Sequence, residues 1–392
     1  MIRKIAPILG ITFIDIVGFS ILLPILPYFV IHFGAPKILV GVLFSVFALC
    51  QFIGGPIWGN LSDRFGRKIV LIISQIGATI GWVMLAFAPD MTWVFIARIV
   101  EGLSGGNISV TQAYVADLVE PEQQTRAYGY IGAAFGAGFV FGPAIGAWTL
   151  AHYGYSATFL VAAGLQVLTL LITIVMLPES RSKEDRQERA QLSDIVQSLR
   201  DPRVSPLLWQ VWMFALSLYA WFAVWALFIN AAIGLGASQT GYLFAASGVV
   251  NVFVQVFVVG RVSDALGDRT TSNAGLACAV LGFLWVPFVH SIPTLIPIFV
   301  LFSLGMALSR ASLTALLTKA SPINQRGTIL GVSSSLDSLS GVLMPTPSTA
   351  ILEVYGASFS GVLSATFSAI ALTLGLLAAR RGRAYVSVES DA

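Results

Sequence analysis

The chain has 392 residues, of which 56% are hydrophobic and only 10% are charged, and its mean hydropathy is +0.84. Because an ordinary soluble domain is about 25% charged, this composition excludes a soluble globular protein and predicts a multi-pass membrane protein. The formal net charge is only +3, and the sequence contains no nucleic-acid-binding motif, so we expect no nucleic-acid partner.

A membrane-spanning helix needs about 20 consecutive apolar residues, and on this criterion the sequence predicts about twelve spans. Their expected bounds are 5–32, 39–60, 69–88, 92–116, 127–150, 156–177, 205–232, 239–261, 271–289, 293–318, 327–352 and 358–379. We therefore expect an all-α polytopic membrane protein with two six-helix bundles. The expected parts are an N-terminal bundle 1–177, a cytoplasmic linker 178–204, a C-terminal bundle 205–380 and a cytoplasmic tail 381–392.

The basic residues predict how the chain lies in the membrane. All Lys and Arg residues except Lys37, Arg98 and Arg310 fall on one side of the predicted spans, and the positive-inside rule makes that side cytoplasmic. Both termini are then cytoplasmic, and we expect the bacterial cytoplasmic membrane as the location. The polar linker either forms a short amphipathic helix on the membrane surface or is a solvated connection between the bundles.

The first span contains "ITFIDIVGFSILLPILPYFV" (11–30), which carries a carboxylate within an apolar run. A charged side chain at bilayer depth is unfavourable, so it normally faces a partner or a polar cavity. Asp15 has no neighbouring cation in its own helix. Such an isolated acid suits a group that loads and releases protons, so Asp15 is a candidate for proton coupling. The alternative is a structural hydrogen bond.

The loop between the second and third spans reads "GNLSDRFGRK" (59–68). Asp63 and Arg67 lie one helical turn apart and can pair, and Gly66 permits a tight turn. The core of the loop recurs as "GRVSDALG" (260–267), 201 residues later.

The repeat extends beyond this loop. Gly129, Pro143, Tyr153 and Gly154 recur as Gly331, Pro345, Tyr355 and Gly356, each 202 residues later. The chain therefore consists of two six-span halves. A parallel repeat of this kind places a binding site between the halves, near the midplane of the membrane.

Four more charged side chains lie in predicted spans. Arg98 and Glu101 are three residues apart on the fourth span and can pair within the helix, so Glu101 has either a structural or a proton-coupling role. Arg310 and Asp337 lie on spans ten and eleven and are expected to pair. That pair either fixes two helices or binds a polar group of the substrate, and Asp337 is a third candidate for proton coupling.

Polar side chains within the spans are candidates for the lining of a substrate cavity. They are Gln51, Arg98, Asn107, Gln112, Asn251, Gln255 and Arg310. The sequence has no metal-ligand spacing, nucleotide-binding loop or catalytic triad. We therefore expect no metal, no cofactor and no enzymatic activity, and we expect an ion gradient as the energy source.

The loop at 59–68 resembles the signature G-x-x-x-D-R-x-G-R-[RK] of the major facilitator superfamily, which lies between the second and third spans of twelve-span transporters. The resemblance implies alternating access by two six-helix bundles, with this loop latching the halves together at the cytoplasmic side. The latch residues that it implies are Gly59, Asp63, Arg64, Gly66, Arg67 and, at the end of span four, Asp117.

Span five contains "GAGFVFGPAIGAW" (136–148), which resembles the G-x-x-x-G-P-x-x-G pattern of exporters in that superfamily. The matching residues are Gly138, Gly142, Pro143 and Gly146. Small residues four apart let helices approach closely, and proline fixes a bend. The resemblance favours export over import.

Over most of its length the chain is similar to the tetracycline/proton antiporters. The shared positions are Asp15, Gly18, Pro24, Leu26, Pro27, Gln51, Phe52, Arg98 and Gln255. Asn251 stands where the family has a histidine, and Gly81 and Ala279 stand where those pumps carry acids. The resemblance implies proton-linked drug export of the kind that confers antibiotic resistance, while leaving the substrate open.

These expectations combine into one functional hypothesis. The protein is expected to be a monomer in the lipid bilayer that exports small amphipathic or lipophilic compounds in exchange for protons, as in multidrug efflux. Two alternatives stay open. One is an exporter of a sugar, a lipid-linked saccharide or another metabolite, with Arg310 and Asp337 binding a polar headgroup. The other is a non-transporting membrane subunit or receptor.

Overall fold

The computed structural model describes residues 2–105, 107–119, 121–179, 201, 204–321 and 326–390. Almost all of these residues are helical, and the described ranges contain no strand. This follows from the long apolar runs, because a backbone in hydrocarbon must satisfy its hydrogen bonds within its own helix. The linker predicted at 178–204 lies almost wholly outside the described residues, so the predicted domain limits stay a prediction.

The chain divides into two compact units. Unit 1 consists of Met1–Gln187, Trp225–Asn230 and Gly234–Gly248, and unit 2 consists of Glu188–Val224, Ala231–Ile233 and Val249–Ala392.

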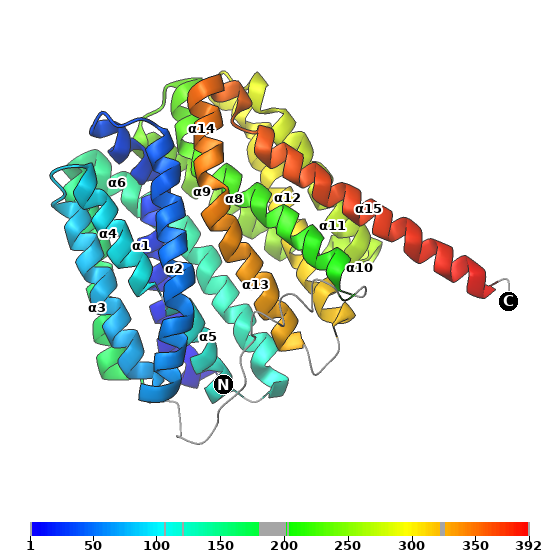
Figure 1. Cartoon of the computed structure of the whole chain (residues 1–392), viewed down its shortest axis with the longest axis horizontal. Coiled ribbons are helices and arrows are strands. Elements are labelled where there is room, and N and C mark those ends of the chain that lie inside the picture. Colours follow the sequence, from blue (N-terminus) through cyan, green and yellow to red (C-terminus); the bar gives the residue numbers. More distant parts are fainter. Residues whose placement is uncertain are drawn as a thin grey trace. The chain divides into compact units, whose positions relative to one another are not determined.

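The helices are labelled in Figure 1. Unit 1 contains α1 (Ile2–His32), α2 (Ile38–Phe65), α3 (Arg67–Ala86), α4 (Met91–Ser104), α5 (Asn107–Leu118) and α6 (Pro121–Met176). Both units share α8 (Ser205–Ile233) and α9 (Ala237–Phe257). Unit 2 also contains α10 (Val259–Leu266), α11 (Asp268–Leu284), η1 (Val286–Phe288), α12 (Ile292–Ala320), α13 (Arg326–Leu343), α14 (Pro345–Tyr355), η3 (Ala357–Phe359) and α15 (Val362–Ser390).

Eight helices of the described chain are long and apolar enough to cross a membrane. One of them, Gly129–Met176, contains two predicted spans joined at Gly154, where a φ of 78° interrupts the helix. Three further predicted spans are short or interrupted. The fourth is divided between α4 and α5, the ninth is the 17-residue α11, and the eleventh is divided between α13 and α14. The twelve-span, all-helical fold is therefore confirmed.

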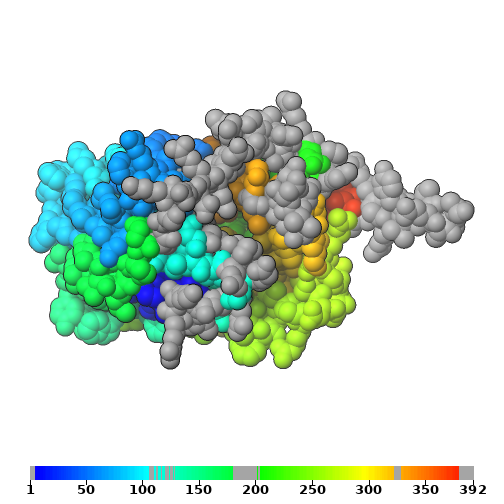
Figure 2. All heavy atoms as spheres, turned by 90° about the horizontal axis from the view of Figure 1, so that it is seen from below, coloured from blue at the N-terminus to red at the C-terminus, as the bar shows by residue number. Residues whose placement is uncertain are grey.

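The central helix of unit 1 is α1. In its most apolar window 67% of the residues are buried, against 28% for α2, and α1 packs along α6. At one end, Ile5 of α1 belongs to an apolar cluster with Tyr114 of α5 and Ala127 of α6. Figure 2 shows this end, where the deep-blue start of α1 lies beside cyan residues. A helix that is apolar on all sides is typical of such a buried position.

The outer face of α3 shows the environment of unit 1. Large apolar side chains, each about half exposed, recur along it every three or four residues and so form one stripe of the helix. They are Ile69, Ile73, Ile76 and Ile80. The opposite face buries Ser74 and Gln75. A stripe of this kind is unfavourable in water and stable in hydrocarbon, as expected of an integral multi-pass membrane protein.

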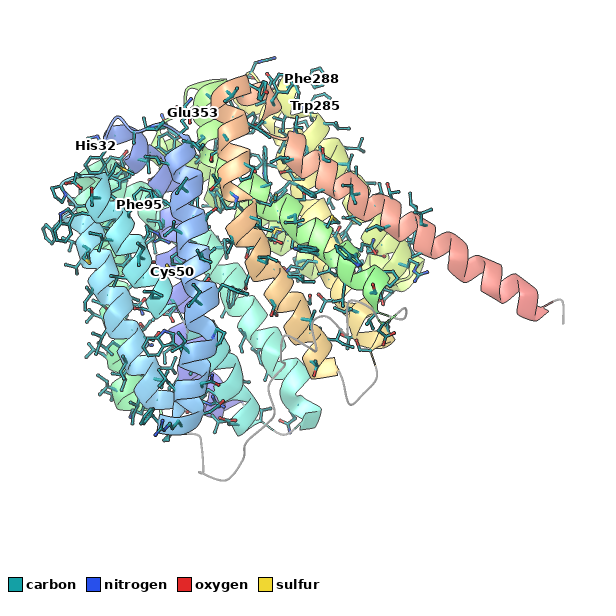
Figure 3. All side chains as sticks on the ribbon, viewed as in Figure 1. His32, Cys50, Phe95, Trp285, Phe288 and Glu353 are labelled. Carbon is teal, nitrogen blue, oxygen red and sulfur yellow. The ribbon has the colours of Figure 1, made fainter. Side chains whose placement is uncertain are left out.

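In unit 2, α11 packs against α12 and α15. Of the eight candidate spans in the described residues, α8 is the most buried, with 78% of its window buried, and α8 opens the second half of the repeat as α1 opens the first. Trp285 and Phe288 lie at one end of unit 2 (Figure 3) and are exposed. Exposed aromatic side chains at span ends are typical of the membrane interface.

Candidate functional site

Asp15 lies half-buried on α1, where it contacts α6. The amide Nε2 of Gln166 donates a hydrogen bond to Asp15 Oδ1 at 3.2 Å and another to Thr169 Oγ1 at 3.2 Å. Gln166 itself is buried. A neutral amide can keep donating to the Asp15 carbonyl oxygen whether the carboxyl is charged or protonated. This arrangement suits an acid that changes its protonation state inside a helix bundle.

The same position in unit 2 holds a neutral pair. Ser217 and Ser368 lie 202 residues after Asp15 and Gln166, and their hydroxyl oxygens are 2.7 Å apart. The polar contact between the first and last helices of each half is therefore repeated, whereas the charge is present only in unit 1. The sequence did not indicate Gln166 or this pairing.

Arg98 and Glu101 form the salt bridge that their spacing on α4 predicted. Arg98 is fully buried, Glu101 is nearly so, and the guanidinium carbon lies 4.1 Å from the centroid of the Phe47 ring. Within the described chain, Arg98 Nε and Nη2 have no hydrogen-bond partner. Gly102, which follows Glu101 on α4, packs against Cys50 of α2, which is labelled in Figure 3. Arg98 is thus an interior residue of unit 1 and not a surface residue.

The fourth span is interrupted between α4 and α5, and neighbouring helices satisfy the carbonyl groups that the break exposes. Trp58 of α2 donates to the carbonyl of Leu103, and Ser74 of α3 donates to that of Ser104 at 2.6 Å. Gln51, predicted to line a cavity, donates to the carbonyl of Gly105 at 3.4 Å. Backbone groups freed at membrane depth need such partners. The glycines of "GLSGGN" were the only sequence signal for this break.

In unit 1, Arg67 connects several residues of the predicted latch. Arg67 pairs with Asp63 at 2.7 Å and with Asp117 at 3.0 Å, and it donates to Ser62 Oγ at 2.6 Å. Gly66 has a φ of 101°, a conformation that glycine adopts without strain. Arg64 is exposed, with its guanidinium 5.3 Å from the Phe65 ring centroid.

Glu179 is a further member of this cluster that sequence reasoning missed. Its Oε1 accepts a hydrogen bond from the backbone N–H of Arg67 at 2.7 Å, and its Oε2 accepts one from that of Lys68 at 3.3 Å. A carboxylate at this position satisfies free N–H groups and the positive end of the dipole at the start of α3. Glu179 thereby connects the end of the sixth span to the loop.

Unit 2 repeats the loop cluster with the charges exchanged. Asp268 lies 201 residues after Arg67, and Lys319 lies 202 residues after Asp117. Lys319 Nζ is 2.6 Å from Asp268 Oδ2, and Ser263, the counterpart of Ser62, donates to Asp268 Oδ1 at 2.5 Å. Hydrogen bonds from Lys319 and then Ser263 hold the pKa of the Asp268 carboxyl below its ordinary value. The exchange of residue types conceals this repeat in the sequence.

We expect Lys319→Met to alter how the stability of the protein depends on pH. A carboxyl with a lowered pKa stabilises the fold above its unfolded pKa, and this contribution is lost as pH falls through the folded-state pKa. Because Lys319 is largely exposed, the effect should be at most about 1 kcal/mol. Thermal unfolding in detergent between neutral and acidic pH measures it, with Asp268→Asn as the control. Equal loss of stability in wild type and Lys319→Met on acidification would contradict the expectation.

The three glycines of the predicted exporter motif face α1. A side chain at Gly138 would meet Ile16 at 2.6 Å, and one at Gly146 would meet Ile21 at 3.0 Å. One at Gly142 would overlap Ser20 Oγ and the Val17 carbonyl oxygen. On another side of the same helix, the glycine Gly241 of α9 approaches the carbonyl of Pro143. The motif therefore supplies close packing of α6 between α1 and the unit 1 segment of α9.

We expect Gly142→Ala to destabilise the protein by about 1–3 kcal/mol, because α1 must move away from α6 to admit the methyl group. Gly132→Ala is a matched control in the same helix, since nothing lies within 4 Å of a Cβ there. That variant should be neutral or slightly stabilising. Unfolding temperatures of the two variants in detergent test this. Equal temperatures would show that the close approach of Gly142 to α1 does not contribute to stability.

Arg310 and Asp337 form the predicted pair in unit 2, although it is long. Arg310 Nη2 is 3.9 Å from Asp337 Oδ2, and the side chains are 60% and 31% exposed. The Tyr219 hydroxyl, on α8, donates to Asp337 Oδ2 at 3.4 Å. This pair is longer and far more exposed than the buried Arg98–Glu101 pair.

The other predicted lining residues are placed as follows. Asn251 is half-buried and Gln255 is exposed on α9. The side chains of Asn107 and Gln112 lie outside the described part of the chain. The described residues contain no group of three or more His, Cys, Asp or Glu that could hold a metal ion.

Comparison with known proteins identifies relatives over nearly the whole chain. Residues 8–233 and 219–391 match the Major Facilitator Superfamily. The chain is 31% identical to the tetracycline resistance protein, class C, of Escherichia coli over 96% of both proteins. It is 26% identical to multidrug resistance protein 2 of Bacillus subtilis (strain 168) over 85% of this chain and 84% of that protein.

Solved structures share the fold at lower identity. The human organic anion transporter MFSD10 (TETRAN) has a TM-score of 0.70 at 22% identity, over 95% of this chain and 99% of that chain. A bacterial homologue of the human lysosomal transporter Spinster has a TM-score of 0.81 at 15% identity, over 96% of both chains. The chain is therefore a membrane transporter and not an enzyme, and it belongs to the Major Facilitator Superfamily.

Proposed function

We propose that the protein exports small amphipathic or lipophilic compounds in exchange for protons, and that Asp15 carries the coupling proton. The observation that carries this proposal is the position of Asp15, a carboxyl on the central apolar helix of unit 1 that accepts a hydrogen bond from the neutral amide of Gln166. An acid in such surroundings is unfavourable unless function requires it. The names of the relatives, tetracycline and multidrug resistance proteins, support export of a drug-like compound.

The other candidate residues have distinct proposed roles. Asp63, Arg67 and Asp117, with Glu179, act as a latch that breaks and re-forms during transport, and the packed glycines of span five keep α6 stiff against α1. Substrate contacts are proposed for Gln51, Arg98, Asn107, Gln112, Asn251, Gln255 and Arg310. Glu101 and Asp337 are proposed as further groups that take part in proton coupling.

A second candidate substrate class rests on one observation, the exposed Arg310–Asp337 pair with Tyr219 beside it. Such a pair suits a polar or anionic headgroup, as in a saccharide, a lipid-linked saccharide or another metabolite. Membership of a transporter family disfavours the alternative of a non-transporting subunit or receptor. We further propose that the protein works as a monomer in a bacterial cytoplasmic membrane with both termini in the cytoplasm.

Transport by the purified protein in liposomes with an imposed pH gradient tests the proposal. Cationic dyes, tetracyclines and sugars form the substrate panel, and quenching of tryptophan fluorescence reports binding independently. We expect a lipophilic compound to move only while the gradient is present. Movement of sugars alone would favour the second candidate, and a pH-independent flux would remove proton coupling from the proposal.

A further inference from the structure

Gln75, on α3, is fully buried, and neither its amide nitrogen nor its amide oxygen has a hydrogen-bond partner within the described chain. An unpaired buried amide costs about 1–3 kcal/mol. Such groups in native proteins generally have a partner or an ordered water. The position of Gln75 in unit 1 therefore decides which groups its amide can reach.

Lys68, Gln75 and Trp82 lie seven residues apart and share one face of α3. At one end of this face, Lys68 Nζ donates to the carbonyl of Ile174 at 2.8 Å. Two turns beyond Gln75, the Trp82 ring centroid lies 6.4 Å from that of Phe159. This face of α3 thus runs antiparallel along α6. Gln75 lies midway between Lys68 and Trp82, so it is level with the middle of the 159–174 stretch of α6.

The middle of that stretch is Gln166, the residue that donates a hydrogen bond to Asp15. Three polar side chains, from α1, α3 and α6, therefore share one level inside unit 1. Of the charged groups on α3, α4 and α5, Glu101 pairs with Arg98 and Asp117 pairs with Arg67.

Unit 2 provides an internal comparison. Ser217 and Ser368 occupy the places of Asp15 and Gln166, and Leu276 lies 201 residues after Gln75. Leu276 is fully buried in an apolar cluster. At this position a polar side chain, Gln75, is thus present only in unit 1, the unit that carries the Asp15 carboxyl. An apolar side chain fills the same position of the fold in unit 2, so packing alone does not require glutamine at residue 75.

We propose that Gln75 and Gln166 hold a water molecule against the Asp15 carboxyl, and that protons reach and leave Asp15 through this water. The inference rests on the proposed function of Asp15 as the proton carrier. In loading, a protonated water gives its proton to the carboxylate, leaving a neutral carboxylic acid and a neutral water, and release is the reverse. Gln75 does not titrate. It is a positioning residue, whose amide supplies the hydrogen bonds that a buried water needs.

Infrared difference spectra between low and high pH test the site directly. For the wild type in lipid, we expect a carboxyl band that Asp15→Asn removes and a water O–H band that shifts in water enriched with oxygen-18. Gln75→Leu, which introduces the residue type of unit 2, should lose the water band and keep the carboxyl band. Persistence of the water band in Gln75→Leu, or its absence from the wild type, would overturn the proposal.

Transport kinetics provide the second test. We expect Gln75→Leu to slow pH-driven uptake by about tenfold or more while substrate exchange, which needs no net proton movement, keeps its rate. Gln75→Asn, which retains an amide, should restore part of the loss. Gln210→Leu is the control for a purely structural effect, because Gln210 is a buried glutamine that donates to Asn273 in unit 2. It should change both rates together or neither.

The two proposals fail in different ways. If the wild type shows no pH-driven uptake, the proposed function fails, and the infrared spectra still decide whether water binds at Gln75. If the wild type is driven by the gradient and Gln75→Leu is equally fast, the water route is wrong and proton-coupled export stands.

Discussion

Asp15→Asn is expected to abolish uptake driven by a pH gradient into inverted vesicles while leaving substrate exchange intact. The asparagine oxygen can still accept the hydrogen bond from Gln166 that Asp15 Oδ1 accepts at 3.2 Å, so the helix contact is preserved and only the titrating group is lost. Loss of a side chain that transfers protons commonly reduces a rate by about 100-fold or more. We expect an effect of that size on the driven rate.

The ratio of driven uptake to exchange is the decisive quantity. A variant that was merely misfolded would lose both rates, whereas loss of coupling lowers the first alone. Ser217→Ala is the matched control, because Ser217 occupies the position of Asp15 in unit 2 and also contacts a residue of the last span. Unchanged driven uptake in Asp15→Asn would exclude Asp15 as the proton carrier.

The spans and the local ion pairs were predictable from the sequence. Hydrophobic length sets the spans, and helical periodicity brings Asp63 to Arg67 and Arg98 to Glu101, so no knowledge of tertiary structure was needed. The breaks between α4 and α5 and between α13 and α14 were not predicted, because hydrophobic length alone does not show where a span is interrupted.

Contacts between distant parts of the chain were not predictable in this way. Gln166 meets Asp15 across 151 positions of sequence, and Glu179 meets Arg67 across 112. These pairings depend on which helices are neighbours and how far each is displaced along its axis, and hydropathy carries neither piece of information. The repeat helps only once the structure is known. The pair of Arg67 and Asp117 then has its counterpart in Asp268 and Lys319, which the exchanged residue types conceal in the sequence.

Glu101→Gln is expected to have the largest effect on stability. It leaves the fully buried Arg98 guanidinium without its counter-charge, and breaking a buried ion pair in this way typically costs about 3–5 kcal/mol. Replacing both partners, as Arg98→Met with Glu101→Leu, removes both charges and should recover most of that loss. Reversible unfolding in mixed micelles of the wild type, Arg98→Met, Glu101→Leu and the double variant measures the coupling, and Glu101→Gln is measured beside them. Equal stability of Glu101→Gln and the wild type would contradict a charged, buried Arg98.

The same double variant separates the two roles open to Glu101. Because Arg98 is also a proposed substrate contact, the ratio of driven uptake to exchange decides, and not either rate alone. If the pair is structural, the apolar variant folds and this ratio stays at the wild-type value. If Glu101 takes part in proton coupling, the variant folds and the ratio falls, as in Asp15→Asn. Because removal of both charges avoids the unpaired cation, a fall in the ratio reflects the missing carboxyl and not a damaged fold.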